Sequence, residues 1–374
     1  MRGYDALLLV SFGGPEGPDE VMPFLERVTH GRGVPRDRLE AVSHHYQALG
    51  GVSPINAQNR GLLAALRPAL DRRGIDLPLA WGNRNSPPFI ADTLRELHAA
   101  GAGRVLAITT AAYASYSGCR QYREDLATAI AETGLRDLEV DKVRLYFDHP
   151  GFVEPFVDGV ARSLGGLAAS GVQFEAVRIL CTTHSIPLAM AEASGPPGTV
   201  RTGRGGAYVA QHTAVIGALL DGLRARGLAT PPVQLVYQSR SGAPHVPWLE
   251  PDINDALRDA RADGAEAVIV VPIGFVSDHV EVVWDLDHEA VETAQELGLL
   301  LQRVPTPGTH PAFVEALVGL IEERVRDVPL ALRPAGPAGA WPDRCPRDCC
   351  ANPRAARPAV AGSDEPAARM SATA

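Results

Sequence analysis

The stretch DGAEAVIVVPIGFVSDH, residues 263–279, decides the fold. A turn leads into a short β-branched apolar run, and a polar segment follows that opens a helical pattern. The stretch GAGRVLAITTAAYASYSGC, residues 101–119, has the same order of parts, and ALLLVSFGGP (6–15) likewise resembles VRILCTTHSIP (177–187). Because the unit recurs in both halves of the chain, the sequence predicts two halves of similar structure.

Outward from these stretches, short aliphatic runs alternate with longer amphipathic segments. This alternation predicts an α/β fold in which parallel sheets carry helices on both faces. We expect strands at 5–11, 77–82, 104–110, 142–147, 176–183, 233–239, 265–272 and 299–305. We expect helices at 57–73, 88–100, 119–133, 151–169, 206–226, 249–263, 279–297 and 310–327.

The chain divides into three predicted parts. Residues 1–150 and 151–328 form the two α/β domains, with the boundary near Pro150–Gly151. Residues 329–374 are rich in Pro, Ala and Arg and cannot bury enough apolar surface to fold alone. We expect this tail to be disordered unless its cysteines tether it.

Composition excludes several classes of protein. The net charge is −9, which argues against a nucleic-acid-binding protein with its basic stripe. ALLLVSF near the start is far shorter than a membrane span and lacks the features of a signal peptide. We therefore expect a cytoplasmic protein without a stable membrane anchor, in which the five cysteines do not form disulfides.

The segment IGFVSDHVEVVWDLDHE, residues 273–289, crowds acids and imidazoles into a few helical turns. On a helix, Asp278, Glu281, Asp285 and Glu289 share one face. A solvated helix face is the alternative, but Trp284 and the intervening valines argue against full exposure. Crowded carboxylates raise one another's pKa, so such a row suits the handling of protons or divalent cations.

His184 follows a predicted buried strand, where an active-site side chain would point. A hydrogen-bonded histidine at a strand end is the simpler alternative. An imidazole opposite carboxylates suits Fe(II) or another first-row divalent metal, and the lack of further nearby histidines favours a metal in transit. Neither a Walker motif nor G-x-G-x-x-G is present, so nucleotide binding is poorly supported.

Six stretches taken together resemble the ferrochelatases, which insert Fe(II) into a porphyrin. The resemblance implies two Rossmann-like domains with a porphyrin cleft between them, and it makes ferrous iron and porphyrin the substrates. The stretches are LLLVSFGGP (7–15), GGVSPIN (50–56), YASYSGCRQYRED (113–125), THSIP (183–187), YQSRSGAPHVPWLEPD (237–252) and PIGFVSDHVEVVWDLDHE (272–289).

The resemblance also implies roles for individual residues. His184 would be the base and first metal ligand, and Glu281 its catalytic and metal-binding partner across the macrocycle. Asp285 and Glu289 would continue a metal or proton route. The porphyrin propionates would meet Ser53, Tyr122, His45 and Tyr46.

Within the ferrochelatases, the sequence resembles the bacterial branch that acts on coproporphyrin III. Arg32, Arg36 and Arg38 offer donors for a substrate with four carboxylates. Protoporphyrin IX, or another tetrapyrrole and metal, is the alternative; a tetrapyrrole carrier is a third, although it would not need both His184 and Glu281. Some relatives have an iron-ligating tyrosine where this chain has Phe12, so an axial ligand is lost there or supplied otherwise.

Some ferrochelatases hold a 2Fe–2S cluster with three C-terminal cysteines and an earlier one. The resemblance points to Cys119, Cys345, Cys349 and Cys350 as its ligands, with Cys181 in reserve because adjacent ligands are awkward. A zinc site, or cysteines without a metal, are the alternatives. We also expect transient contact with neighbouring enzymes of the haem pathway.

Overall fold

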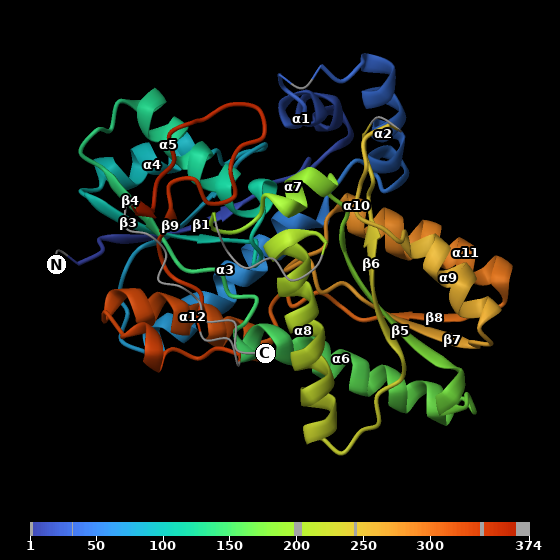
Figure 1. Cartoon of the computed structure of the whole chain (residues 1–374). Helices are drawn as coiled ribbons and strands as arrows, with labels where there is room; N and C mark the ends of the chain where they lie inside the picture. Colours follow the sequence, from blue (N-terminus) through green and yellow to red (C-terminus); the bar gives the residue numbers. More distant parts are fainter. Residues whose placement is uncertain (1–2, 32, 198–203, 243–244, 337–339, 364–374) are drawn as a thin grey trace.

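Two four-stranded parallel sheets form the framework of the protein (Figure 1). The structure is a computed structural model, and it describes residues 3–31, 33–197, 204–242, 245–336 and 340–363. The strand orders are β2-β1-β3-β4 and β6-β5-β7-β8, so the predicted pair of similar α/β halves is confirmed. The strands are β1 (Ala6–Ser11), β2 (Leu79–Asn83), β3 (Arg104–Thr109), β4 (Glu139–Lys142), β5 (Val177–His184), β6 (Val233–Gln238), β7 (Ala267–Val271) and β8 (Leu300–Arg303).

The central strands read as continuous apolar runs because helices cover both faces of each sheet. Every residue of β1, β3 and β7 is buried, as parallel strands of this kind require. One strand prediction was wrong in position. β4 spans Glu139–Lys142 instead of 142–147, because residues 143–147 leave the ladder and bury their side chains against the helices that follow.

The predicted helices are present, with shifts of a few residues at their ends. They are α3 (Pro54–Arg72), α4 (Ile90–Ala99), α5 (Gln121–Thr133), α6 (Pro150–Ala169), α8 (Gly206–Ala225), α9 (Ile253–Ala262), α11 (Ala290–Leu297) and α12 (Pro311–Val325). Three further helices were not predicted: α1 (Val21–Val28), α2 (Arg36–Ala48) and α7 (Leu188–Glu192). Short 3-10 turns are η1 (Pro18–Glu20), η3 (Phe174–Ala176) and η5 (Leu330–Leu332).

Two segments adopt the wider π-helical turn, one in each half. They are η2 (Tyr116–Arg120), which leads into α5, and η4 (Trp284–Glu289), which lies between α10 (Val280–Val283) and α11. η2 follows the loop after β3, whereas η4 follows the loop after β7 only after the short helix α10. Because π turns inside helices occur frequently at functional sites, the side chains of both segments are candidates for the functional site.

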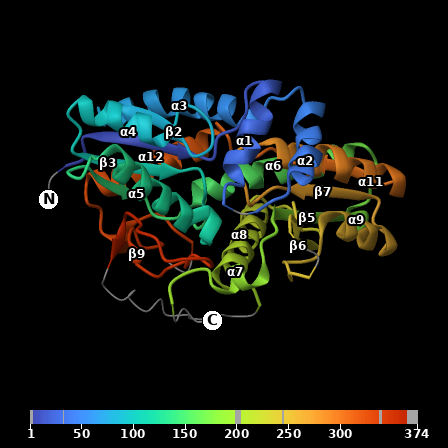
Figure 2. The same cartoon turned by 90° about the horizontal axis from the view of Figure 1, so that it is seen from above.

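Helix α12 joins the two halves. It packs on α3 of the first half and on α6 of the second (Figure 2). Glu315 accepts from Arg72 and Arg73, which secures the α3 side of this contact. The division at Pro150–Gly151 stays a prediction.

The described part of the tail folds back on the first half (Figure 1). Trp341 is buried against Phe147, with ring centroids 5.8 Å apart. Two short strands, β9 (Cys345–Pro346) and β10 (Gly362–Ser363), pair in parallel. The tail thus has no core of its own and takes its apolar contacts from the body of the protein.

Gly274 allows β5 and the loop after β7 to approach closely. A Cβ at this position would lie 2.1 Å from Thr183 Oγ1 and 2.7 Å from Thr183 Cα, next to His184. We expect Gly274→Ala to lower the free energy of unfolding by about 1–3 kcal/mol, the usual cost of overpacking. Equilibrium unfolding in urea measures this.

Gly217, an exposed residue of α8, is the matched control. An added Cβ would meet nothing within 4 Å there, so Gly217→Ala should instead stabilise by up to about 1 kcal/mol. Equal effects of the two substitutions would contradict the close approach at Gly274.

Candidate active site

His184 is the last residue of β5, at the carboxyl end of its sheet. Its Nδ1 faces the carbonyl oxygen of Ser185, which orients the ring. A carbonyl can only accept, so the neutral imidazole carries its proton on Nδ1 and leaves Nε2 as the basic atom. Nε2 is therefore the atom that can take a proton or meet a metal ion.

Glu281 lies opposite this nitrogen. Its Oε2 is 3.5 Å from His184 Nε2, and the two side chains are 47% and 34% exposed, so solvent screens the pair in part. Burial alone would lower the pKa of His184, but Glu281 raises it above the ordinary value. The pKa of Glu281 falls to about 2, because the attraction of His184 exceeds the effect of burial. Glu281 is therefore ionised at neutral pH, and its charge favours the protonated form of His184.

Asp285 extends the site along the helix. Burial, reinforced by the charges of Glu281 and Glu289, raises its pKa to about 7 although Ser239 donates a hydrogen bond to it. Gln238 Nε2 also donates to Asp285, at 3.2 Å. The expectation that crowding raises carboxyl pKa values therefore holds for Asp285 but not for Glu281.

The π turn of η4 keeps the row in line. In an α-helix, residues four apart drift around the axis, and the wider i to i+5 turn reverses this drift. Glu281, Asp285 and Glu289 thus follow one another, and exposed Glu289 accepts from Trp284 Nε1 at 2.9 Å. The sequence predicted one uninterrupted α-helix over 279–297, and this prediction was wrong at η4.

Asp278 does not belong to the row, and its predicted place there was wrong. It precedes the helix and accepts from Arg303 at 3.1 Å and from Thr306 at 3.2 Å. Its backbone N–H meets Gln58 of the first half at 2.8 Å. Asp278 thus anchors the loop, because its carboxylate is occupied by these donors.

His45 and Tyr46 of α2 face the row from the first half. His45 stacks on Trp284 with ring centroids 4.2 Å apart, and its pKa, lowered mainly by burial, responds to Glu289 and Glu281. Tyr46 is buried, and the charge of Glu281 adds to the burial that raises its pKa. The structure therefore places these two residues beside the row, and their predicted contact with the porphyrin propionates stays a prediction.

Ser53 and Tyr122 lie on other elements of the first half. Ser53 is buried at the start of α3, and its backbone N–H donates to Pro15 in the loop after β1. Tyr122 is buried in the first turn of α5, after η2. The guanidinium of Arg84 lies 4.7 Å from the Tyr122 ring centroid and 5.4 Å from that of Phe12. Sequence analysis missed Arg84, which brings a cation to these aromatic rings.

Of the arginines expected to serve a substrate with four carboxylates, the two that the structure describes do not form part of the row. Arg36 is exposed and pairs with Glu26 and Glu40. Arg38 is exposed on α2, where its charge lowers the pKa of His45. Arg32 lies outside the described residues.

Four of the five cysteines come together between the first half and the tail. The thiol of Cys119 interacts electrostatically with those of Cys345 and Cys350, Cys345 is hydrogen-bonded to Cys349, and the Cys349 and Cys350 sulfurs are 3.8 Å apart. Burial raises the pKa of Cys119 to about 12, whereas the hydrogen bond with Cys349 helps to lower that of Cys345 to about 6. Cys181, buried in β5, interacts with Tyr113 in the core.

The donor set suits an iron–sulfur cluster in type and number, since such clusters take four thiolates. Buried Arg123 and Lys142 line the same cavity as Cys119 and Cys345 and would balance thiolate charge. In the part of the chain that the structure describes, no three His, Cys, Asp or Glu side chains converge on one metal-ion position. The cysteines would therefore have to separate from their present hydrogen bonds to hold iron.

Known proteins can now be compared with this geometry. A family model described as Ferrochelatase matches residues 4–325. A coproporphyrin III ferrochelatase of Streptomyces coelicolor is 54% identical over 372 residues, which cover 97% of either chain. One of Leifsonia xyli is 53% identical, covering 96% of this chain and 94% of its own. A ferrochelatase of Rhodopirellula baltica is 47% identical and covers 96% of each.

An imidazole facing carboxylates beyond the strand ends of an α/β sheet fits an enzyme that handles divalent metal ions. With the family model and these identities, the chain belongs to the ferrochelatase family. It is accordingly a metal chelatase of the lyase class, with porphyrin and ferrous iron as the family's substrates. Among the described residues, no helix is both long and apolar enough to cross a membrane.

The His184–Glu281 pair makes a testable prediction about pH. Because Glu281 raises the pKa of His184, we expect Glu281→Gln to lower it. Only neutral His184 accepts a proton, so the acidic limb of the activity profile should move to lower pH in this variant. The ring signals of His184 in an NMR titration measure the pKa directly.

Asp285→Asn is the comparison variant. The charge of Asp285 raises the pKa of His184 less than Glu281 does. Loss of Asp285 should therefore shift this pKa less than loss of Glu281. A larger shift in Asp285→Asn than in Glu281→Gln would show that the pair does not control the imidazole.

Proposed function

We propose that the protein inserts Fe(II) into coproporphyrin III and forms Fe-coproporphyrin III in haem biosynthesis. The choice of porphyrin is supported by the relatives named coproporphyrin III ferrochelatase, which match nearly the whole chain at 54% and 53% identity. The observation that carries the chemistry is the 3.5 Å approach of His184 Nε2 to Glu281. Protoporphyrin IX as substrate is the alternative, which the experiment below distinguishes.

The reaction exchanges two protons for one metal ion. A free-base porphyrin carries two pyrrole N–H groups, and both protons must leave as Fe(II) binds the four nitrogens. In this proposal neutral His184 accepts the pyrrole protons one after the other at Nε2, and Glu281 stabilises the imidazolium each time. The first proton leaves through the carboxyl groups beyond Glu281 before the second is accepted. A positioned base of this kind contributes about 10²- to 10⁴-fold to the rate.

Asp285 and Glu289 then continue the proton or metal route. A carboxyl group with a pKa of about 7 can give up and regain a proton near neutral pH at little cost. Glu289, exposed at the end of the row, would exchange protons or ferrous ions with solvent. Carboxylates and imidazole are suitable transient ligands for Fe(II). They do not enclose the ion in a permanent site, as a full set of thiolates would.

Binding of the porphyrin carboxylates falls to the first half in this proposal. Ser53, Tyr122, His45 and Tyr46 would contact them, as the family resemblance implies. The Arg84 guanidinium beside buried Tyr122 is already paired with Asp125, so the assignment of Tyr122 rests on the family resemblance. A phenyl ring at Phe12, packed edge-on to Phe24, cannot serve as an axial iron ligand.

We further propose that Cys119, Cys345, Cys349 and Cys350 hold a 2Fe–2S cluster. When bound, such a cluster supplies a one-electron redox centre and a covalent bridge between η2 and the tail. The gathering of these four thiols, with Cys181 elsewhere in the core, supports this ligand set. A zinc ion on the same thiolates is the alternative.

His184→Ala should lower kcat for iron insertion by about 10²- to 10⁴-fold. Anaerobic assays with coproporphyrin III and protoporphyrin IX, run side by side, measure both rate and preference. His98→Ala is the control, because His98 is a partly exposed residue of α4 paired with Asp137. Near-normal turnover by His184→Ala would remove it as the base, and faster use of protoporphyrin IX by the wild type would overturn the proposed substrate.

Cys345→Ala should abolish the visible absorbance of the cluster in protein purified without oxygen. Cys181→Ala should keep it, because Cys181 is not part of the gathered set. The iron and acid-labile sulfide content of each variant provides the second readout. A full cluster in Cys345→Ala would contradict the ligand set, and zinc without sulfide in the wild type would favour the alternative.

A further inference from the structure

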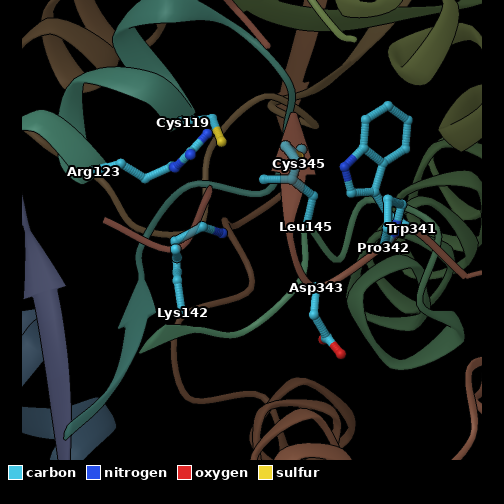
Figure 3. Close-up of a pocket in the computed structure, with 9 residues that line it drawn as sticks. Cys119, Arg123, Lys142, Leu145, Trp341, Pro342, Asp343 and Cys345 are labelled. Atoms are coloured by element: carbon cyan, nitrogen blue, oxygen red, sulfur yellow. The ribbon is translucent and has the colours of Figure 1, made fainter. Parts of the chain in front are cut away.

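A cavity beside the gathered cysteines is lined by Cys119, Cys345, the buried cations Arg123 and Lys142, and the carboxylate of Asp343 (Figure 3). Cys119 and Arg123 come from η2 and α5, Lys142 ends β4, and Cys345 comes from the tail. The space that these residues bound, open solvent at its mouth included, is about 220 Å³. The cavity therefore joins thiols and cations from segments far apart in the sequence.

Arg123 is held rigidly at this cavity. Only 2% of the residue is exposed, and its Nε donates to the carbonyl of Val360 at 2.8 Å. The backbone N–H of Val360 in turn donates to the carbonyl oxygen of Arg123 at 3.1 Å. The head group thus has a fixed orientation, and in Figure 3 the side chain extends toward Cys119.

The two terminal nitrogens of Arg123 point to an anionic ligand. Nη1 and Nη2 are buried without a hydrogen-bond partner among the described residues. Leaving charged donors buried and unpaired is strongly unfavourable, so a fold retains such a group where an acceptor binds. Lys142 is 4% exposed, and its Nζ donates one hydrogen bond to the carbonyl of Val143 at 2.7 Å. It adds a second positive charge to the cavity lining.

We propose that Arg123, assisted by Lys142, positions and electrostatically stabilises the 2Fe–2S cluster by donating Nη1–H and Nη2–H to its sulfur atoms. This inference rests on the cluster proposed above. Two ferric ions, two sulfides and four thiolates leave the cluster with a net negative charge, and a one-electron reduction adds another. Cations and N–H donors favour the more negative state, so they raise the reduction potential.

The test is a redox titration of the cluster in the full-length protein, monitored by EPR of the reduced form. At the wild-type midpoint potential, Arg123→Gln should lower the ratio of reduced to oxidised cluster about tenfold, which corresponds to about 59 mV for a one-electron couple. Arg123→Lys, which keeps the charge, should recover part of this shift. Arg354→Gln removes an exposed charge from the tail and should leave the potential unchanged.

The possible outcomes separate the two proposals. Wild-type protein without a cluster would overturn both. A cluster present in all variants at an unchanged potential would overturn only the role of Arg123. If Arg123→Gln does not retain a cluster, Lys142→Gln carries the test: a more negative potential supports the cation pair, and an unchanged one overturns it.

Discussion

The parallel pairing of β5 with β6 and β7 is the interaction on which the site depends. β5 ends at His184, which is in register with Gln238 of β6, and Gln238 in turn donates to Asp285. On the other side, Gly274 N–H donates to Thr182 after β7 has ended and so directs the chain toward the helix of Glu281. One ladder therefore sets the imidazole, the acidic row and the loop between them, because ligands bind beyond the carboxyl ends of such strands.

Electrostatics then give the three central groups different proton affinities. Glu281 is held ionised beside His184 and its pKa falls to about 2, whereas burial raises the pKa of Asp285 to about 7. The difference arises from partners: an imidazole faces Glu281, while burial and the neighbouring carboxylates act on Asp285. Two neighbouring carboxyl groups on one helix face therefore bind protons with very different affinities.

The sequence predicted the parts of this arrangement that depend on local pattern. The buried strands, their order with the helices, and the place of His184 after β5 followed from apolar runs and turns. The π turn of η4 could not be predicted in this way, because one extra residue in a single turn changes the hydrophobic periodicity too little to be recognised. The position of Asp278 was predicted wrongly because its partner Arg303 is distant in sequence. Arg123 of the cysteine cavity was not predicted because the tail residues that line this cavity with it are also distant in sequence.

The tail makes its contacts with both halves of the chain. Cys350 accepts from the backbone N–H of Gly195 at 3.2 Å and donates its own N–H to the Gly195 carbonyl at 3.1 Å, in the segment that follows β5 and α7. Close by, its thiol interacts with Cys119 of the first half. Since residues 345–350 follow both halves in chain order, this tie can form only after both have been synthesised. Assembly of the cysteine site is therefore a late step of folding, and a chain released too early would carry the catalytic row without it.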